Sequence, residues 1–273
     1  MKTEELRTML TAQGIDAEEV CIIKNGIECH GIRLITSDEI SPIVYYSPSE
    51  TAEEFLNRCK QIQEMQKPII DTEMITNPEY IKEHAFLCVQ KKSNENLIKR
   101  NYLNLEVYIR VGIGLNSALE TGSIKPTRNF LNDCELDEAT LWEFARANTL
   151  GQIKVQSVQE MLGIIDDALP AVPLYIFSCE NNYGAAALCL PELFQDFCKE
   201  HEVDGCVVLP SSTAEVLAIP DDMVPTSAED MADMVRCINA SDVEPILQLE
   251  PVVYHFDVSE NAFSILADDD ERR

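Results

Sequence analysis

The sequence predicts an α+β fold, in which helices pack on a mixed, largely antiparallel sheet or sheets, as one unit or as two closely associated lobes. Three observations lead to this prediction. The dipeptide Asn25–Gly26 lies between two β-rich runs and is a strong hairpin signal, because both turn residues need a positive φ. Amphipathic helical stretches alternate with short apolar runs in the second half of the chain. Two of these runs, Cys206–Leu209 and Val216–Ile219, lack polar alternation, which predicts central strands covered on both faces.

The N-terminal part is predicted to begin with a helix over about residues 2–13, where Leu6, Met9 and Leu10 have helical spacing. The hairpin follows, and the run PIVYY predicts a third strand. A second helix is expected after Thr51, because the sequence Thr-Ala-Glu-Glu that starts there is a capping box.

Two further strands are predicted before residue 112. Asn77-Pro78 marks the start of a short helix, which leads into the apolar run AFLCV. In the run LNLEVYIRVGI, apolar residues then alternate strictly with polar or small ones, which predicts a strand with one face in the core and one exposed to solvent. The alternating apolar residues are Leu103, Leu105, Val107, Ile109 and Val111.

The stretch Gly112–Asn132 is rich in Gly, Asn, Ser and Thr and is the best candidate for a boundary between lobes. The sequence therefore predicts an N-terminal α+β lobe over residues 1–111, a connecting segment over 112–132, a C-terminal α+β lobe over 133–267 and an acidic tail over 268–273.

Four helices are predicted in the C-terminal lobe, two of which begin at capping boxes whose first residues are Ser157 and Ser227. The helices are expected at Asp137–Asn148, Val158–Leu169, Pro191–His201 and Ala228–Asn239. The strands are expected at VPLYIF, GAAALCL, GCVVL, EVLAI, VVYHFDV and AFSIL.

The charge of the chain restricts its partners. Asp and Glu number 48 against 21 Lys and Arg, which gives a formal net charge of −27. Such a field repels phosphate backbones and anionic lipid, so we expect neither direct nucleic-acid binding nor membrane association. The simplest interpretation of the acidity is a soluble surface. The alternatives are a docking surface for a protein partner with a basic surface and a decoy that mimics nucleic acid.

The cysteines indicate the compartment. Ten of them lie without a short repeating spacing, and several fall inside apolar runs, which is typical of free thiols in a reducing environment. The N-terminus lacks the apolar region of a signal peptide, and no apolar run is long enough to span a membrane. We therefore expect a cytoplasmic protein.

No catalytic residue is predicted. Ser211 and Ser212 follow a predicted strand, but their context is Leu-Pro-Ser-Ser-Thr and not the Gly-x-Ser-x-Gly of a nucleophile elbow. The sequence from Ser212 to Glu215 is typical of a capping box, so a structural role is favoured.

No metal site and no cofactor are predicted either. The chain has no Cys-x-x-Cys pair and no Gly-Lys-Ser phosphate loop, and its four histidines are far apart in sequence. Cys29 and His30 are adjacent, which in a strand sends their side chains to opposite faces.

A small ligand is the remaining possibility for the serine turn, because hydroxyl groups and free N–H groups at the end of a strand suit an anion. We expect a candidate ligand-binding site if this turn and the Asn-Asn-Tyr segment before Gly184 come together in space. Its residues would be Asn181, Asn182, Tyr183, Ser211, Ser212 and Glu215.

Three segments also carry a resemblance. Tyr183–Ala186, Leu209–Ser212 followed by Glu215, and Asn239–Tyr254 resemble the shared motifs of an uncharacterised domain-of-unknown-function family of anaerobic gut bacteria. A weaker similarity runs to a second uncharacterised bacterial family, from whose Asn-Tyr-Asp-Ala-Ser and Pro-Ser-Arg-Asp motifs this chain departs. The resemblance implies a bacterial, cytoplasmic α+β protein and supplies no catalytic residue, cofactor or partner.

The function expected from the sequence is a non-enzymatic binding or interaction protein, acting on a small ligand or on a protein partner. The alternatives are a hydrolase with a serine or cysteine nucleophile and the acidic decoy described above. The hydrolase would need an activated side chain beside a base, and the sequence contains no recognisable pair of this kind.

Overall fold

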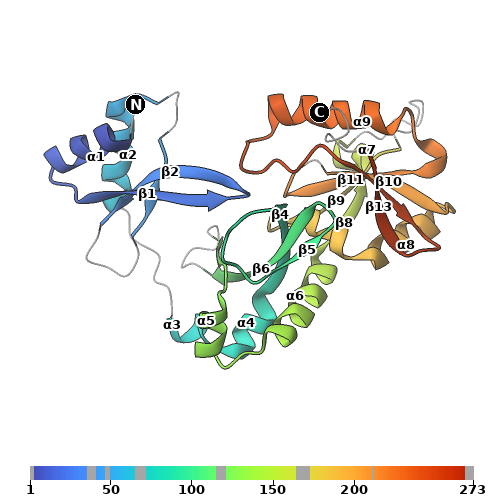
Figure 1. Ribbon diagram of the computed structural model, residues 1–273, viewed down its shortest axis with the longest axis horizontal. Coiled ribbons are helices and arrows are strands. Elements are labelled where there is room, and N and C mark those ends of the chain that lie inside the picture. The colour runs from blue at the N-terminus through green and yellow to red at the C-terminus, as the bar shows by residue number, and fades with distance from the viewer. Residues whose placement is uncertain are drawn as a thin grey trace. The chain divides into compact units, whose positions relative to one another are not determined.

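The computed structural model describes residues 3–35, 41–46, 50–64, 72–114, 121–163, 173–210 and 212–267. It confirms the α+β class (Figure 1), and every pairing between described strands is antiparallel. The chain forms two compact units, Met1–Ile69 and Ile70–Arg273.

Unit 1 is a three-stranded sheet in the order β1-β2-β3 with helices that pack on it. The predicted hairpin is confirmed, because Asn25 and Gly26 have φ values of 50° and 74° and join β1 to β2. The core of the unit includes Leu6, Ile32 and Phe55. Its elements are α1 (Thr3–Ala12), β1 (Ala17–Lys24), β2 (Ile27–Leu34), β3 (Ile43–Val44) and α2 (Ala52–Glu64).

Unit 2 contains two sheets. The first has β4, β6 and β5 in that order, with β7 also paired to β6, and the second has the order β13-β12-β10-β11-β9-β8. The elements up to α6 are α3 (Thr72–Ile75), α4 (Pro78–His84), β4 (Ala85–Lys91), β5 (Lys99–Tyr102), β6 (Leu105–Gly114), β7 (Thr121–Ile124), α5 (Arg128–Asp133) and α6 (Glu138–Gln152). The later elements are β8 (Lys154–Ser157), α7 (Val158–Met161), β9 (Tyr175–Ser178), η1 (Gly184–Cys189), α8 (Pro191–Glu200), β10 (Gly205–Pro210), β11 (Glu215–Pro220), η2 (Asp221–Met223), α9 (Ala228–Asp242), β12 (Val253–Asp257) and β13 (Ala262–Ala267).

The two runs without polar alternation are central strands, as predicted. They form β10 and β11, which pair with each other in the middle of the six-stranded sheet. One face of these strands packs with α8 and η1, and the other packs with α9. Apolar side chains are therefore buried on both faces, which explains why the sequence does not alternate there.

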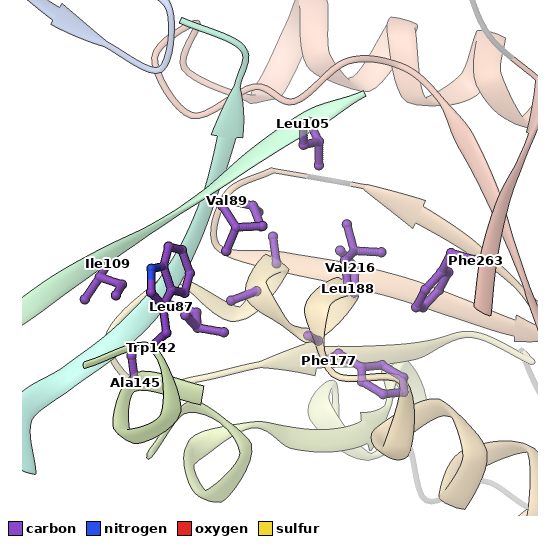
Figure 2. Close-up of a cluster of buried hydrophobic side chains, with 14 of the residues drawn as sticks. Leu87, Val89, Leu105, Ile109, Trp142, Ala145, Phe177, Leu188, Val216 and Phe263 are labelled. Carbon is purple, nitrogen blue, oxygen red and sulfur yellow. The ribbon is translucent and has the colours of Figure 1, made fainter. Parts of the chain in front are cut away.

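One hydrophobic core joins the two sheets of unit 2. Figure 2 shows Leu87 and Val89 of β4 in one cluster of buried side chains with Leu188 of η1 and Val216 of β11. Residues on either side of the segment 112–132 thus belong to one cluster, and the compact units divide near Ile69 instead. This division differs from the predicted lobes because β6 and β7, two strands rich in glycine and polar residues near their paired ends, belong to one sheet.

The run GAAALCL was predicted as a strand, and this prediction is wrong. Residues Gly184–Cys189 form the 3₁₀ helix η1, whose first five residues are buried. A Cβ on Gly184 would meet the carbonyl oxygen of Ala214 at 2.5 Å and Cα of Ser178 at 2.6 Å. The small residues are needed because the backbone here lies close to β9 and to the turn before β11. A buried 3₁₀ helix allows such a close approach as well as a buried strand does.

The predicted helix starts are mostly correct. Ser157 and Glu160 form a reciprocal capping box at α7, and Ser227 accepts a hydrogen bond from the backbone of Asp230 at α9. The helix predicted over Val158–Leu169 is described as α7 only to Met161, and its second half lies largely outside the described residues. The predicted tail, 268–273, lies outside them as well. No helix in the described ranges combines the length and apolar character needed to cross a bilayer.

Candidate functional site

The polar face of β6 is the most unusual surface of unit 2. Leu105, Val107 and Ile109 enter the common core, and the residues between them point to the other side of the sheet. That side was predicted to be exposed to solvent, and the prediction is wrong, because Glu106 and Tyr108 are only 2% and 4% exposed. The chain covers this part of the face, so the Glu106 carboxylate and the Tyr108 hydroxyl are held out of water.

An apolar cluster occupies the middle of this face. Phe86 and Cys88 of β4 pack with Tyr108 of β6, and Leu97 and Tyr183 pack against them. The registers of β4 and β6 place Cys88 opposite Tyr108. Burial raises the pKa of the Cys88 thiol and of the Tyr108 hydroxyl, so both groups stay neutral near pH 7.

Glu106, at one end of this face, is surrounded by a complete set of partners. Its carboxylate accepts hydrogen bonds from Gln90 Nε2 at 2.7 Å and Ser93 Oγ at 2.6 Å, and it pairs with Lys99 Nζ at 2.9 Å. Burial alone would raise the pKa of Glu106, but the hydrogen bonds from Ser93, Gln90 and Lys99 outweigh it and lower that pKa. The buried carboxylate of Glu106 therefore stays ionised near pH 7.

Arg110, at the other end, is partly buried and has neutral partners. Its Nε donates to Ser123 Oγ at 2.8 Å, and its Cζ lies 5.1 Å from the centroid of the Tyr183 ring. It also hydrogen-bonds with Tyr108. Burial would lower the pKa of Arg110, but Tyr183 and Tyr108 beside it raise that pKa, so the guanidinium keeps its charge. Among the described residues, no carboxylate forms an ion pair with Arg110.

Lys125 brings a second cation to the same face. Its Nζ lies 5.1 Å from the centroid of the Tyr108 ring and 2.8 Å from Glu95 Oε1. Unlike Arg110, Lys125 therefore has a carboxylate partner. Tyr108 thus contacts both cations, Lys125 through its ring and Arg110 through its hydroxyl group.

The segment before η1 and the serine turn do come together, as the sequence analysis required. The backbone N–H of Gly184 donates to the carbonyl of Ala214 at 2.8 Å, and that of Ala185 donates to the carbonyl of Thr213 at 3.3 Å. Strand β9 also pairs with β11, so Ser178 lies opposite Glu215. These bonds position Tyr183, whose ring packs at a tilt against that of Phe86 with a centroid distance of 5.4 Å.

The predicted site residues have different roles. The Asn181 side chain accepts hydrogen bonds from the Tyr183 backbone at 3.1 Å and the Cys179 thiol at 2.6 Å, which closes the turn around it. Asn182 is exposed at φ 60° and occupies the left-handed position of that turn. Of the predicted site residues that the structure describes, Tyr183 is the one that contacts the polar face of β6.

The serine turn carries no helix. Ser212 is buried and accepts a hydrogen bond from the backbone of Ala214 at 3.1 Å, and Glu215 is already the first residue of β11. The predicted capping box from Ser212 to Glu215 is therefore wrong, because the local hydroxyl bond closes a short turn instead. Ser211 lies outside the described residues.

None of the histidines forms a hydrogen bond with a serine or cysteine in the described part of the chain. His84 Nδ1 lies 2.9 Å from the Tyr80 carbonyl, and His255 Nε2 lies 2.9 Å from Asp221 Oδ2. His201 packs on the rings of Tyr175 and Phe197. The arrangement of a base beside a nucleophile is not found among these residues.

Sequence reasoning missed Arg110, Tyr108 and Glu106 as site residues. Their alternation with apolar residues was recognised, but alternation says only that a face differs from the core and does not say that solvent covers it. A useful signal was available in the residue types, because Glu, Tyr and Arg at successive positions on one face, beside the apolar Phe86 and Cys88 of β4, are unusual for a solvated surface.

A comparison with protein-family models matches residues 3–258 to a family described as a family of unknown function (DUF5688). Neither the comparison with curated proteins nor the comparison with solved structures finds a match.

Proposed function

The chain belongs to this family of unknown function, and we propose on the geometry of its site that it is a non-enzymatic binding protein whose ligand is a small anion held by Arg110. The ligand class is a carboxylate or a phosphate group. Both present the oxygen pairs that a planar guanidinium binds with two parallel hydrogen bonds.

The observation that supports this proposal is the set of neighbours around Arg110. Buried or half-buried arginines normally pair with a carboxylate, because an uncompensated cation is costly away from water. Carboxylates are plentiful here, with 48 Asp and Glu in the chain, yet the described partners of Arg110 are hydroxyl groups and an aromatic ring. An anionic ligand would supply the missing charge.

The hydroxyl groups around Arg110 suit the same ligand. Ser123 accepts from Arg110 and hydrogen-bonds with Tyr183, so one hydroxyl proton of this pair is used between them and the other can donate to an anion. Burial raises the pKa of the Tyr183 hydroxyl, which keeps it protonated and able to donate near pH 7. A cation with neutral donors beside it is a common way to bind an anion without a metal.

The acidic surface should affect how the anion arrives. A net charge of −27 repels an approaching anion, and salt screens this repulsion. We therefore expect the association rate to increase with ionic strength, whereas a ligand attracted by the surface would show the opposite trend.

The test is isothermal titration calorimetry with inorganic phosphate and with succinate as probes, on the full chain and on its Arg110→Gln variant. We expect at least one probe to bind the unmodified chain and to lose about tenfold or more of its affinity in the variant, because a charge-assisted bidentate contact contributes about 1.5–3 kcal/mol. Arg110→Lys should fall between the two, since lysine keeps the charge without the fork.

The matched control is Arg100→Gln. Arg100 is also a strand arginine stacked on an aromatic ring, with its Cζ 4.2 Å from the centroid of Trp142, but it is exposed. Its replacement should leave binding unchanged. Equal affinity in the Arg110 and Arg100 variants, or no binding of either probe to the unmodified chain, would contradict the proposal.

The hydrolase alternative has less support, because burial leaves Cys59 and Cys189 poorly activated. Burial raises the pKa of Cys59 to about 11 and of Cys189 to about 12. A hydrogen bond with Cys206 lowers the pKa of Cys198, but Cys198 lies on the buried face of α8 and is not exposed to solvent. We expect iodoacetamide to find no cysteine that reacts faster than the exposed Cys21 and Cys237, and a less exposed thiol that does so would favour the hydrolase.

A further inference from the structure

The β1–β2 hairpin of unit 1 brings three metal-binding side chains to one exposed patch. The two-residue turn at Asn25–Gly26 fixes the register, so Cys21 of β1 lies directly opposite His30 of β2. Glu28 precedes His30 by two positions and points to the same face. All three side chains are exposed.

The ligand atoms of this patch are close enough to share one ion. A sulfur of Cys21, a carboxylate oxygen of Glu28 and a ring nitrogen of His30 all lie within 4.8 Å of one another. Zinc bonds of about 2.0–2.3 Å in a tetrahedron place ligand atoms about 3.5 Å apart. Small rotations of these exposed side chains close that gap, and the hairpin backbone does not have to move.

The same three side chains have no competing partners. In the described ranges, no hydrogen bond or ion pair engages the side chain of Cys21, Glu28 or His30. The neighbouring carboxylate on this face, Glu19, is by contrast occupied, since it accepts from Thr3 Oγ1 at 3.1 Å and lies 3.7 Å from Arg7 Nε. The three ligands can therefore bind an ion without breaking an existing contact.

From this geometry we propose that Cys21, Glu28 and His30 form a zinc-binding site. Thiolate, imidazole and carboxylate together are a ligand set that Zn²⁺ accepts, whereas Mg²⁺ and Ca²⁺ prefer oxygen ligands alone. Binding releases the thiol proton of Cys21, and a fourth position is left for water or another ligand. The site uses residues of unit 1 and is independent of the anion proposed at Arg110.

Sequence motifs do not reveal this site, because its ligands are not a Cys-x-x-Cys or Cys-x-x-His pair. Cys29 is next to His30 in sequence, but it lies on the opposite face of β2, where its thiol donates to the carbonyl of Ile27 at 3.7 Å. The cysteine that matters lies across the hairpin. This arrangement also supplies a control variant, since Cys29→Ser changes a thiol beside the site without removing a ligand.

The experiment measures how fast iodoacetamide alkylates individual cysteines of the full chain, with and without Zn²⁺, by peptide mass spectrometry. Cys21 and Cys237 are the two exposed thiols among the described residues. We expect Zn²⁺ to slow the alkylation of Cys21 by about tenfold or more, because a metal-bound thiolate is shielded, and to leave Cys237 unaffected. Cys237 thus serves as an internal reference in the same sample.

Variants identify the ligands. Glu28→Gln and His30→Gln should each remove most of the protection of Cys21, whereas Cys29→Ser should keep it. Substitution of Co²⁺ for Zn²⁺ should give the thiolate-to-metal absorption of a tetrahedral cobalt site in the unmodified chain, and Cys21→Ser should abolish it. Circular dichroism of each variant separates loss of the site from loss of the fold.

Two results would overturn the proposal. One is equal protection of Cys21 and Cys237, which would mean that Zn²⁺ binds thiols without a built site. The other is protection of Cys21 that survives in both Glu28→Gln and His30→Gln, because the thiol would then bind the metal without the two partners that the hairpin places beside it.

Discussion

The charged groups at the two ends of the polar face of β6 differ in whether the chain supplies a partner of opposite charge. Glu106 is nearly inaccessible and has hydrogen bonds from Gln90 and Ser93 as well as an ion pair with Lys99. Arg110, on the same face of the same strand, contacts Ser123, tyrosine hydroxyl groups and a ring. One charge is compensated within the chain, and the other has no carboxylate among the described residues.

This difference separates a structural charge from a candidate binding group. A satisfied buried ion pair restricts the chain to one arrangement, and it has no capacity left for a ligand. A guanidinium with neutral neighbours is less favourable for the free protein, and a bound anion would relieve that cost. The same strand can therefore stabilise the fold at one end and bind a ligand at the other.

The largest expected effect follows replacement of Glu106. Glu106→Ala leaves Lys99 without its buried carboxylate partner and removes one acceptor each from Gln90 and Ser93, so we expect the free energy of unfolding to fall by about 3 kcal/mol. Urea unfolding followed by circular dichroism measures this. Glu138→Ala is the control, because Glu138 pairs with the exposed Arg128 and should cost less than about 1 kcal/mol. Equal losses in the two variants would remove the contrast drawn for Glu106.

A smaller effect is expected from pH. The pKa of Glu106 is lower in the folded chain than in the unfolded one, where it is about 4.3. The stabilisation from its ionised form is therefore fully present above about pH 5 and is lost as the pH falls through the folded-state value. Unfolding free energies measured from pH 7 to pH 3 should fall more steeply for the unmodified chain than for Glu106→Gln. Parallel curves would mean that the network does not favour the ionised carboxylate.

The smallest effect is expected for the stability of the Arg110→Gln variant. Glutamine can keep a hydrogen bond to Ser123 and removes a partly buried cation, so the unfolding free energy should stay within about 1 kcal/mol of the unmodified chain. The same denaturation experiment tests this. A loss as large as that of Glu106→Ala would show that Arg110 is a structural group, and the asymmetry of the strand would then disappear.

Much of the fold could be predicted from local patterns. The hairpin turn requires positive φ at both residues, and Asn25–Gly26 is a dipeptide that readily adopts it. The apolar runs of β10 and β11 do not alternate with polar residues, which predicts strands buried on both faces. In both cases the local sequence is enough to predict the structure. The local sequence is not enough for the run that forms η1, because small apolar residues fit a buried 3₁₀ helix and a buried strand equally well.

The candidate sites were harder to predict, because distant segments form them. Tyr183 was predicted as a site residue from its own turn, but its partner Arg110 is on a strand of the other sheet. The Asn-Asn-Tyr segment leads into η1, whose first residue Gly184 donates to the carbonyl of Ala214, and no sequence motif describes this contact. Cys21 and His30 likewise meet only through the register of a hairpin.

The backbone bonds that hold η1 to the turn at Thr213 and Ala214 imply an order of assembly. The Glu106 network involves residues between Gln90 and Glu106, so it can form as soon as neighbouring strands of one sheet pair. The surroundings of Arg110 are complete only after Tyr183 arrives from a segment that the ribosome makes much later. During synthesis we therefore expect the Lys99–Glu106 ion pair to form first and the surroundings of Arg110 to form last. The chain would then bind an anion only after unit 2 has folded completely.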